Sequence, residues 1–287
     1  MTGAATTADA AAPVGDTGTG DDLAFALALA ARAGEVLMDR YERLEQIDYK
    51  SARDVVTEAD HQSEALIIDA IREHHPLDAI LAEESGEHRA IAGEAPTSGR
   101  GRLWIIDPLD GTVNYANGIP FFCVSIGLIV DGAPSVGVVH DPTRGETFAA
   151  TADGPAMLTA ALGSPSHAIN ASDKEKVSDF VISMSLSGRS AVGRSRAVRR
   201  AIRISRSMGS AALALAYVAN GRFDAFIQQG GLSAWDVAAA GLIAERGGGR
   251  VTSMDGGPWF DLARKPASIG ILAAPAAHHG TLLDLVR

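Results

Sequence analysis

Cysteine is almost missing from this sequence of 287 residues, in which Cys123 stands alone. A single cysteine cannot form an intrachain disulfide, and it cannot build a cysteine-cluster metal site. A chain without disulfides suits a reducing compartment, so we predict a cytoplasmic protein.

Long hydrophobic runs are also missing. The most apolar stretch covers residues 23–31 and is closed by Arg32, whereas a membrane-spanning helix needs about 20 apolar residues. Residues 1–20 are rich in Ala, Thr and Gly and lack the basic and apolar segments of a signal peptide. We therefore predict no membrane association, a disordered tail over residues 1–20 and a folded unit over residues 21–287.

Positive charge is scarce, because 25 Lys and Arg residues face 35 Asp and Glu residues, a net charge of −10. A negative surface repels nucleic-acid backbones and anionic membranes, so nucleic acid is not expected as a principal partner. The arginine-rich residues 189–206 could grip a phosphate-rich partner or form a solvated helix face. We prefer the solvated face.

Hydrophobic periodicity predicts an α/β fold. Apolar residues at helical spacing predict helices, and short apolar runs between Gly, Pro and Asp turns predict strands. The predicted helices cover residues 23–44, 58–75, 191–204, 210–219 and 235–246, and a terminal helix ends near Val286. The predicted strands include residues 79–82, 103–106, 123–130, 134–139, 147–150, 180–184, 223–227 and 269–273.

The same pattern predicts where the loops lie and how the chain divides into two halves. Asp21 and Asp22 are predicted caps of the first helix, and residues 50–54 and 89–102 are predicted loops. The strand and helix pattern starts again after Gly154. We predict an N-terminal α/β half of about residues 21–150 and a C-terminal half of about residues 151–287.

The most informative motif is Trp-Ile-Ile-Asp-Pro-Leu-Asp-Gly-Thr at residues 104–112. An apolar strand leads into Asp107 and Asp110, which can converge on one cation, and the carbonyl of Leu109 offers another hard oxygen ligand. Gly111 lets a phosphate approach the backbone, and amides at a helix starting at Thr112 would face the same anion. Taken alone, such a motif is more often a simple surface turn.

Further acids stand at three other places where an element begins or ends. Glu83 and Glu84 follow a short apolar run, Asp60 closes residues 55–60 ahead of a helix, and Asp236 precedes an Ala-rich helix. Each has a simpler interpretation: a solvated loop for Glu83, and a helix N-cap for Asp60 and Asp236. Oxygen ligands of this kind are those that Mg²⁺ prefers.

Together these segments resemble the successive motifs of the inositol monophosphatase family, in the family's order. The segments are residues 54–60, 83–85, 104–112, 209–211 and 235–240, and the sequences WIIDPLDGTVNY and WDVAAAG are the most specific. The resemblance covers nearly the whole chain from about residue 21. It implies a layered α/β fold with αβαβα layers and mixed sheets.

The resemblance also implies roles for individual residues. It assigns metal binding to Glu83, Asp107, the Leu109 carbonyl, Asp110 and Asp236, with two or three Mg²⁺ ions per site. It assigns the holding and activation of the attacking water to Asp60 and Thr112. It also gives Glu83 a catalytic role. The residues implied to contact substrate are Asp110, Gly111, Thr112, Gly209, Ser210, Ala211, Gln229 and Asp236.

The implied activity is Mg²⁺-dependent hydrolysis of a small phosphate monoester, by in-line attack of an activated water. Inositol monophosphate or a related polyol or sugar phosphate is the favoured substrate. The alternatives within the family are histidinol phosphate, fructose 1,6-bisphosphate and a 3′-phosphonucleotide. An alternative of another class is a regulatory protein that binds a macromolecule on the same scaffold.

One position departs from the family pattern. Relatives that hydrolyse inositol phosphates carry a glutamate seven residues before the last aspartate, where this chain has Gln229. An amide can bond a hydroxyl but would not attract an ammonium group as a carboxylate does, which disfavours histidinol phosphate. The resemblance further implies a homodimer and inhibition by lithium.

Overall fold

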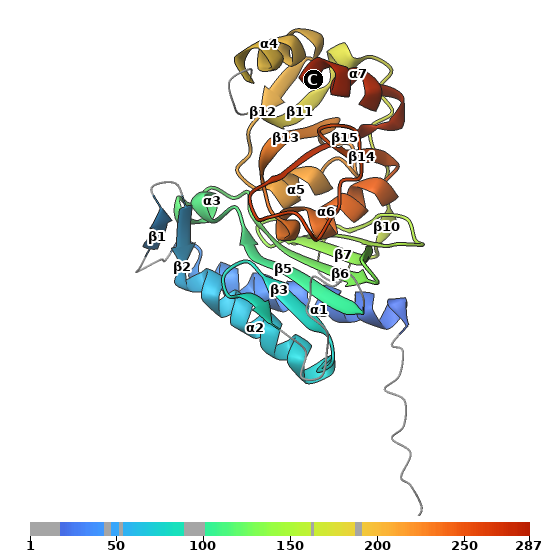
Figure 1. Ribbon diagram of the computed structural model, residues 1–287. Coiled ribbons are helices and arrows are strands. Elements are labelled where there is room, and N and C mark those ends of the chain that lie inside the picture. The colour runs from blue at the N-terminus through green and yellow to red at the C-terminus, as the bar shows by residue number, and fades with distance from the viewer. Residues whose placement is uncertain (1–17, 43–46, 52–53, 89–100, 162–163, 187–190) are drawn as a thin grey trace, which may run out of the picture.

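Two β-sheets stacked between three layers of helices make up the structure, a computed structural model (Figure 1). It describes residues 18–42, 47–51, 54–88, 101–161, 164–186 and 191–287. Helices α1 and α2 cover the outer face of the first sheet, α5 and α6 lie between the sheets, and α4 and α7 cover the second. The predicted αβαβα layering is confirmed.

The first sheet has the strand order β10-β9-β8-β7-β6-β5-β3-β4, and only its β3–β5 pair is parallel. Its strands are β3 (Ala79–Ala82), β4 (Gly86–His88), β5 (Arg102–Asp110), β6 (Cys123–Val130), β7 (Ala133–Asp141), β8 (Glu146–Thr151), β9 (Met157–Thr159) and β10 (His167–Ala168). Its outer helices are α1 (Thr19–Arg40) and α2 (Glu58–His74). Outside both large sheets, β1 (Ile47–Ser51) and β2 (Asp54–Thr57) pair antiparallel.

The second sheet has the order β12-β11-β13-β15-β14. Its strands are β11 (Val181–Ser185), β12 (Ile204–Arg206), β13 (Ala225–Leu232), β14 (Gly249–Ser253) and β15 (Ile269–Pro275). The helices are α3 (Thr112–Ala116), α4 (Ala191–Ala201), α5 (Ala211–Ala216), α6 (Ala234–Arg246) and α7 (Ala276–Val286), with a 3₁₀ turn at Val177–Asp179. Strands β9 and β10 still belong to the first sheet, so the change of sheet falls after Ala168.

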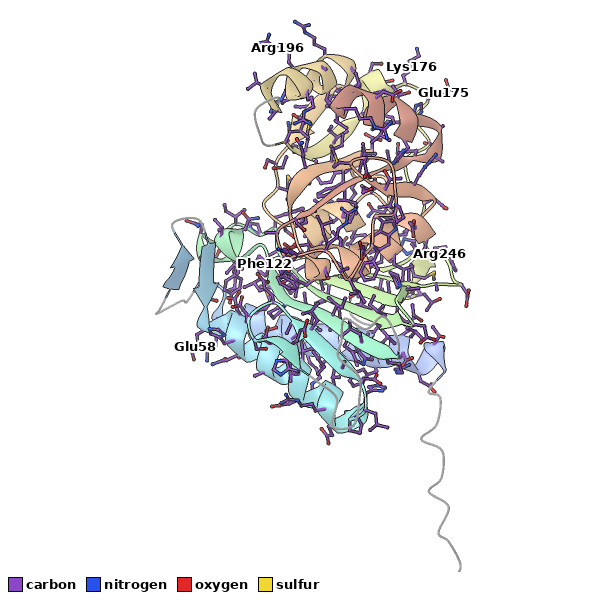
Figure 2. The ribbon with its side chains drawn as sticks, viewed as in Figure 1. Glu58, Phe122, Glu175, Lys176, Arg196 and Arg246 are labelled. Carbon is purple, nitrogen blue, oxygen red and sulfur yellow. The ribbon has the colours of Figure 1, made fainter. Side chains whose placement is uncertain are left out.

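Apolar side chains fill the spaces between the layers (Figure 2). Trp104 and Phe122, both fully buried, belong to the cluster under α1 and α2. Arg196, by contrast, projects outward from α4. None of the helices in the described ranges is long and apolar enough to cross a membrane.

Close contact between α6 and the first sheet depends on a glycine in β7, which has no side chain to separate them. A Cβ atom placed on Gly137 of β7 would lie 2.6 Å from the carbonyl oxygen of Ala239, a distance that any larger residue would have to relieve by moving the helix. The Ser125 hydroxyl of β6 also donates to the carbonyl of Trp235, at 3.3 Å. These contacts fix α6 against β6 and β7.

Several predicted boundaries were wrong. The first helix begins at Thr19, inside the predicted tail, and its N-cap is Gly18, so Asp21 and Asp22 lie in its first turn. Asp22 is buried and bonds the Arg102 guanidinium at 2.7 Å, a tertiary contact that local sequence does not reveal. The predicted helix over residues 191–204 ends at Ala201.

Further differences concern the strands. The predicted loop over residues 50–54 contains the end of β1 and the start of β2. Residues 89–100 of the other predicted loop, and 1–17 of the predicted tail, lie outside the described residues. The predicted strand 223–227 begins at Ala225 and continues to Leu232.

Candidate active site

A bulge in β5 places Asp107 and Asp110 on one side of the first sheet. Asp107 pairs with Ser125 and Asp110 with Cys123, so three steps along β5 oppose two along β6. In a regular strand residues three apart face opposite sides, and one extra residue brings them to the same side. Pro108 cannot donate a ladder hydrogen bond, which suits a bulge.

Glu83 reaches the same corner through parallel pairing. In the parallel β3–β5 pair Ala82 lies opposite Ile106. The next residue along the chain is Glu83 after Ala82 and Asp107 after Ile106, so these two acids lie side by side. The two carboxyl groups share a hydrogen bond. A hydrogen bond between two carboxyl groups requires one of them to be protonated, and a bound cation could take the place of that proton.

Asp236 enters the corner from the first turn of α6. Its Oδ2 accepts the backbone N–H of Ser233 at 2.6 Å, and the Ser233 side chain accepts in return from the backbone of Asp236. This reciprocal capping box fixes the aspartate side chain at the helix start. The N-cap is therefore Ser233 and not Asp236, the candidate cap in the sequence; Asp236 contributes to the capping box and also lies in the cluster.

The three aspartates form a compact oxygen cluster. One carboxylate oxygen each from Asp107, Asp110 and Asp236 lies within 4.8 Å of the others. Burial, followed by the charges of Glu83, Asp110 and Asp236, raises the pKa of Asp107 well above its usual range. Burial and the charge of Asp110 likewise raise the pKa of Asp236. Ionised acids this close in a buried corner need positive charge nearby, so the donor set fits a hard divalent cation.

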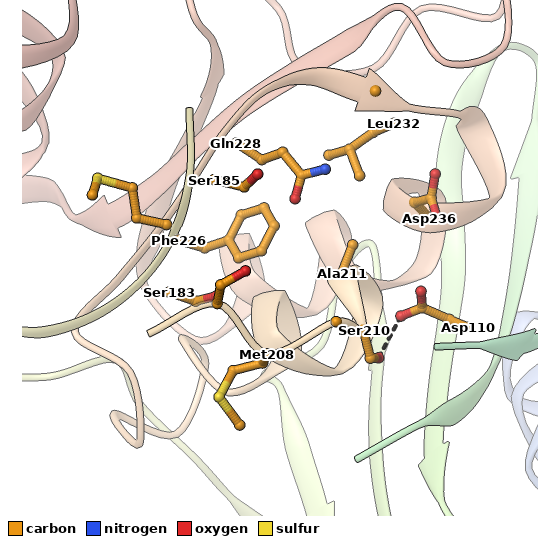
Figure 3. Close-up of a pocket in the computed structure, with 14 residues that line it drawn as sticks. Asp110, Ser183, Ser185, Met208, Ser210, Ala211, Phe226, Gln228, Leu232 and Asp236 are labelled. Atoms are coloured by element: carbon orange, nitrogen blue, oxygen red, sulfur yellow. Dashed lines mark hydrogen bonds between the residues drawn. The ribbon is translucent and has the colours of Figure 1, made fainter. Parts of the chain in front are cut away.

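Asp110 is held from the side away from the cluster (Figure 3). Its Oδ2 accepts the Ser210 hydroxyl at 2.5 Å and the Ala212 amide at 2.7 Å. Burial raises the pKa of Asp110, and these hydrogen bonds oppose that rise because they stabilise the carboxylate. The second oxygen of Asp110 lies on the side toward Asp236.

Asp60 and Thr112 meet beside the carbonyl group of Leu109. The Thr112 hydroxyl lies 3.2 Å from Oδ1 of Asp60 and 3.1 Å from the carbonyl oxygen of Leu109, and can donate to one at a time. Oδ2 of Asp60 accepts both the N–H and the hydroxyl of Thr57. Burial raises the pKa of Asp60 to about 6, against the effect of the Thr57 hydrogen bonds.

Gly111 occupies a conformation that favours glycine. Its φ angle is +98°, and it is the N-cap of α3, which begins at Thr112 as predicted. A Cβ atom there would lie 3.1 Å from both the Phe121 carbonyl oxygen and the Ser210 Cβ. The turn thus needs glycine for its angle and for its space.

A cavity of about 280 Å³ opens beside Asp110 and Asp236. Its wall contains the predicted segment 209–211, together with serines of β11 and the residues Phe226 and Gln228 of β13. Figure 3 shows the Gln228 amide and the Phe226 ring in this wall. Gln229 is not among the lining residues, so its role in substrate binding stays a prediction.

The predicted site residues therefore come together as one corner. Asp60, Glu83, Asp107, Leu109, Asp110, Thr112 and Asp236 converge, and Gly209, Ser210 and Ala211 adjoin it. Sequence reasoning missed Ser183, Ser185, Phe226 and Gln228. Their alternation along β11 and β13, which puts residues two apart on one face, could have identified them.

The fold and site define a layered α/β protein with a largely buried carboxylate cluster suited to a hard cation. The sequence matches the model of the inositol monophosphatase family over residues 21–287. The chain belongs to that family.

Three similar proteins illustrate the relationship. Nus factor SuhB of Pseudomonas aeruginosa is 36% identical over 83% of this chain and 87% of its own length. A fructose-1,6-bisphosphatase/inositol-1-monophosphatase of Thermotoga maritima is 35% identical over 82% of this chain and 86% of its own. The crystal structure of extragenic suppressor protein suhB from Bartonella henselae has a TM-score of 0.81 and 31% identity, and covers 93% of this chain and 98% of that one.

Proposed function

We propose that this chain is a Mg²⁺-dependent phosphatase that hydrolyses a monophosphate ester of a small, uncharged, hydroxylated alcohol. The observation that carries the proposal is the convergence of Asp107, Asp110 and Asp236 within 4.8 Å beside a polar cavity. Two or three Mg²⁺ ions held by these acids, Glu83 and the Leu109 carbonyl would supply charge for the phosphoryl oxygens and raise the acidity of water.

In this proposal Asp60 accepts a proton from the attacking water and Thr112 orients it. A pKa of about 6 leaves Asp60 ionised at neutral pH yet basic enough to accept a proton. The Thr112 hydroxyl, which already lies between Asp60 and the Leu109 carbonyl, can orient the water by accepting its hydrogen bond. Direct attack of water on phosphorus then needs no covalent phosphoenzyme.

The cavity wall supports an uncharged alcohol as the leaving group. Its hydrogen-bonding side chains are serines and Gln228, its apolar ones include Phe226 and Met208, and its charged residues are Asp110 and Asp236. No Lys or Arg is among the described lining residues. A second phosphate group would find no cation there, which disfavours fructose 1,6-bisphosphate and bisphosphorylated nucleotides.

The test is phosphate release from a panel of monoesters with and without Mg²⁺. The panel contains inositol 1-phosphate, glycerol 2-phosphate, histidinol phosphate, fructose 1,6-bisphosphate and a 3′-phosphonucleotide. We expect kcat/KM to be highest for the uncharged polyols. Equal rates across the panel would contradict the assigned substrate class, and no Mg²⁺-dependent release from any compound would contradict the activity itself.

A second candidate function rests on the names of the relatives. The Pseudomonas aeruginosa relative is called a Nus factor, so the alternative is that this chain acts mainly as a regulatory protein that binds a macromolecule. Affinity purification of wild type and Asp107→Asn from the native cell distinguishes the two functions. A stoichiometric partner retained by both proteins, without phosphatase activity, would favour the binding role.

We further propose a homodimer, inhibition by lithium and a cytoplasmic location. Sedimentation velocity, Li⁺ titration of turnover and cell fractionation test them in turn. A species sedimenting only as the 29.7 kDa monomer would refute the dimer.

A further inference from the structure

One face of α2 contacts the proposed site at three points, two in the segment 104–112 and one in the turn after β3. Asp60, Ser63 and Glu64 stand at spacings of three and four residues, so they share a helix face. Asp60 meets Thr112, and Ser63 donates its hydroxyl to the carbonyl oxygen of Pro108 at 3.0 Å. The proposed mechanism uses Asp60 but gives no task to Glu64.

Glu64 is buried, with 4% of its surface exposed. Its Oε2 accepts the backbone N–H of Glu84 at 2.9 Å, and its Oε1 accepts that of Ser85 at 3.0 Å. Both amides belong to the turn that follows β3 and begins with Glu83. A buried carboxylate that accepts two backbone donors fixes the position of that turn.

We propose that Glu64 is a positioning residue that holds Glu83 in place for metal binding. The inference rests on the proposed metal site and adds to it a residue outside the ligand set. Glu83 is the first residue of the turn between β3 and β4, and Glu64 accepts the backbone N–H groups of the next two residues of that turn. Glu64 and Asp60 lie on the same helix, so α2 links the position of the proposed metal ligand to that of the proposed base.

The turn would move when Glu64 is replaced by glutamine. The glutamine side chain has one oxygen and one NH₂ group, so one of the two backbone amides would face a donor instead of an acceptor. Loss of a residue that orients a metal ligand typically costs roughly 10- to 100-fold in metal affinity. We expect a loss of that size for Glu64→Gln.

Calorimetric titration of Mg²⁺ into the full chain tests this without requiring turnover, and electron paramagnetic resonance of free Mn²⁺ gives an independent measure. The matched control is Glu73→Gln, which removes one exposed carboxylate from the same helix. The control should bind metal like wild type. Glu64→Asp, which keeps the charge but shortens the reach, should lie between wild type and Glu64→Gln and serves if the glutamine variant does not fold.

A double-mutant cycle separates positioning from a general loss of stability. If Glu64 acts through Glu83, Glu64→Gln should change metal affinity less than about twofold in a Glu83→Gln background. A full additive loss in that background, or unchanged affinity in Glu64→Gln alone, would overturn the inference. Wild type that binds no divalent cation would instead refute the proposed metal site.

Discussion

Replacement of Asp60 by asparagine should stabilise the protein while it removes activity. The pKa of Asp60 rises from its ordinary 3.8 to about 6, mainly through burial. The folded protein therefore binds this proton more tightly than the unfolded chain does. The associated stability is fully present below pH 3.8 and is lost as the pH rises through 6.

The size of the effect follows from the two pKa values. An ionised Asp60 costs about 3 kcal/mol of folding free energy at pH 8, and the side chain is almost fully buried, so solvent does not reduce this figure. For a protein of 287 residues, the stability that Asp60→Asn would gain corresponds to a rise of about 5 °C in Tm. Asparagine can keep the bonds, because its oxygen can accept from Thr57 while its NH₂ donates to Thr112.

The assay is thermal or urea unfolding in EDTA at pH 4 and pH 8, with Asp69→Asn on the exposed face of α2 as the control. We expect Asp60→Asn to gain stability at pH 8 and little at pH 4, whereas the control changes by less than about 0.5 kcal/mol at either pH. Turnover should fall by roughly 100-fold or more. A variant less stable than wild type at pH 8, or a gain equal at both pH values, would refute the reasoning.

Other perturbations test the corner from different sides. Gly111→Ala should lower the unfolding free energy by about 1–3 kcal/mol, because φ is +98° and Cβ would crowd Phe121; chemical denaturation measures it, and an unchanged midpoint would contradict the strain. Mg²⁺ should raise Tm more at pH 8 than at pH 5, because the raised pKa of Asp107 lets protons compete with the cation; an equal shift at both pH values would argue against binding at these acids. Ser210→Ala should cost about 1–3 kcal/mol, since it removes a buried donor to Asp110; a stability loss below 0.5 kcal/mol by urea unfolding would show that the bond is dispensable.

Local sequence predicted the parts of the site that local chemistry determines. The run from Trp104 to Thr112 contains its own strand, turn and helix start, so the positions of Asp107, Asp110 and Gly111 could be anticipated. The α/β class followed from the strand and helix periodicity, and the αβαβα layering followed from the family resemblance.

Long-range pairing could not be predicted in the same way. The parallel β3–β5 register that sets Glu83 beside Asp107, and the bulge that turns Asp110 to the same side, depend on contacts between distant segments. The ion pair between Asp22 and Arg102 was missed for the same reason. Short strands such as β12 carry too few residues for periodicity to show.

The most direct test of the central claim is the initial rate of phosphate release from a polyol monophosphate as Mg²⁺ is added. Wild type should be inactive in EDTA and gain activity saturably with Mg²⁺, while Asp107→Asn should stay inactive at every concentration although it remains folded. The exposed Asp153→Asn should behave like wild type. Metal-independent turnover, or an Asp107→Asn variant with the same Mg²⁺ response as wild type, would contradict the account.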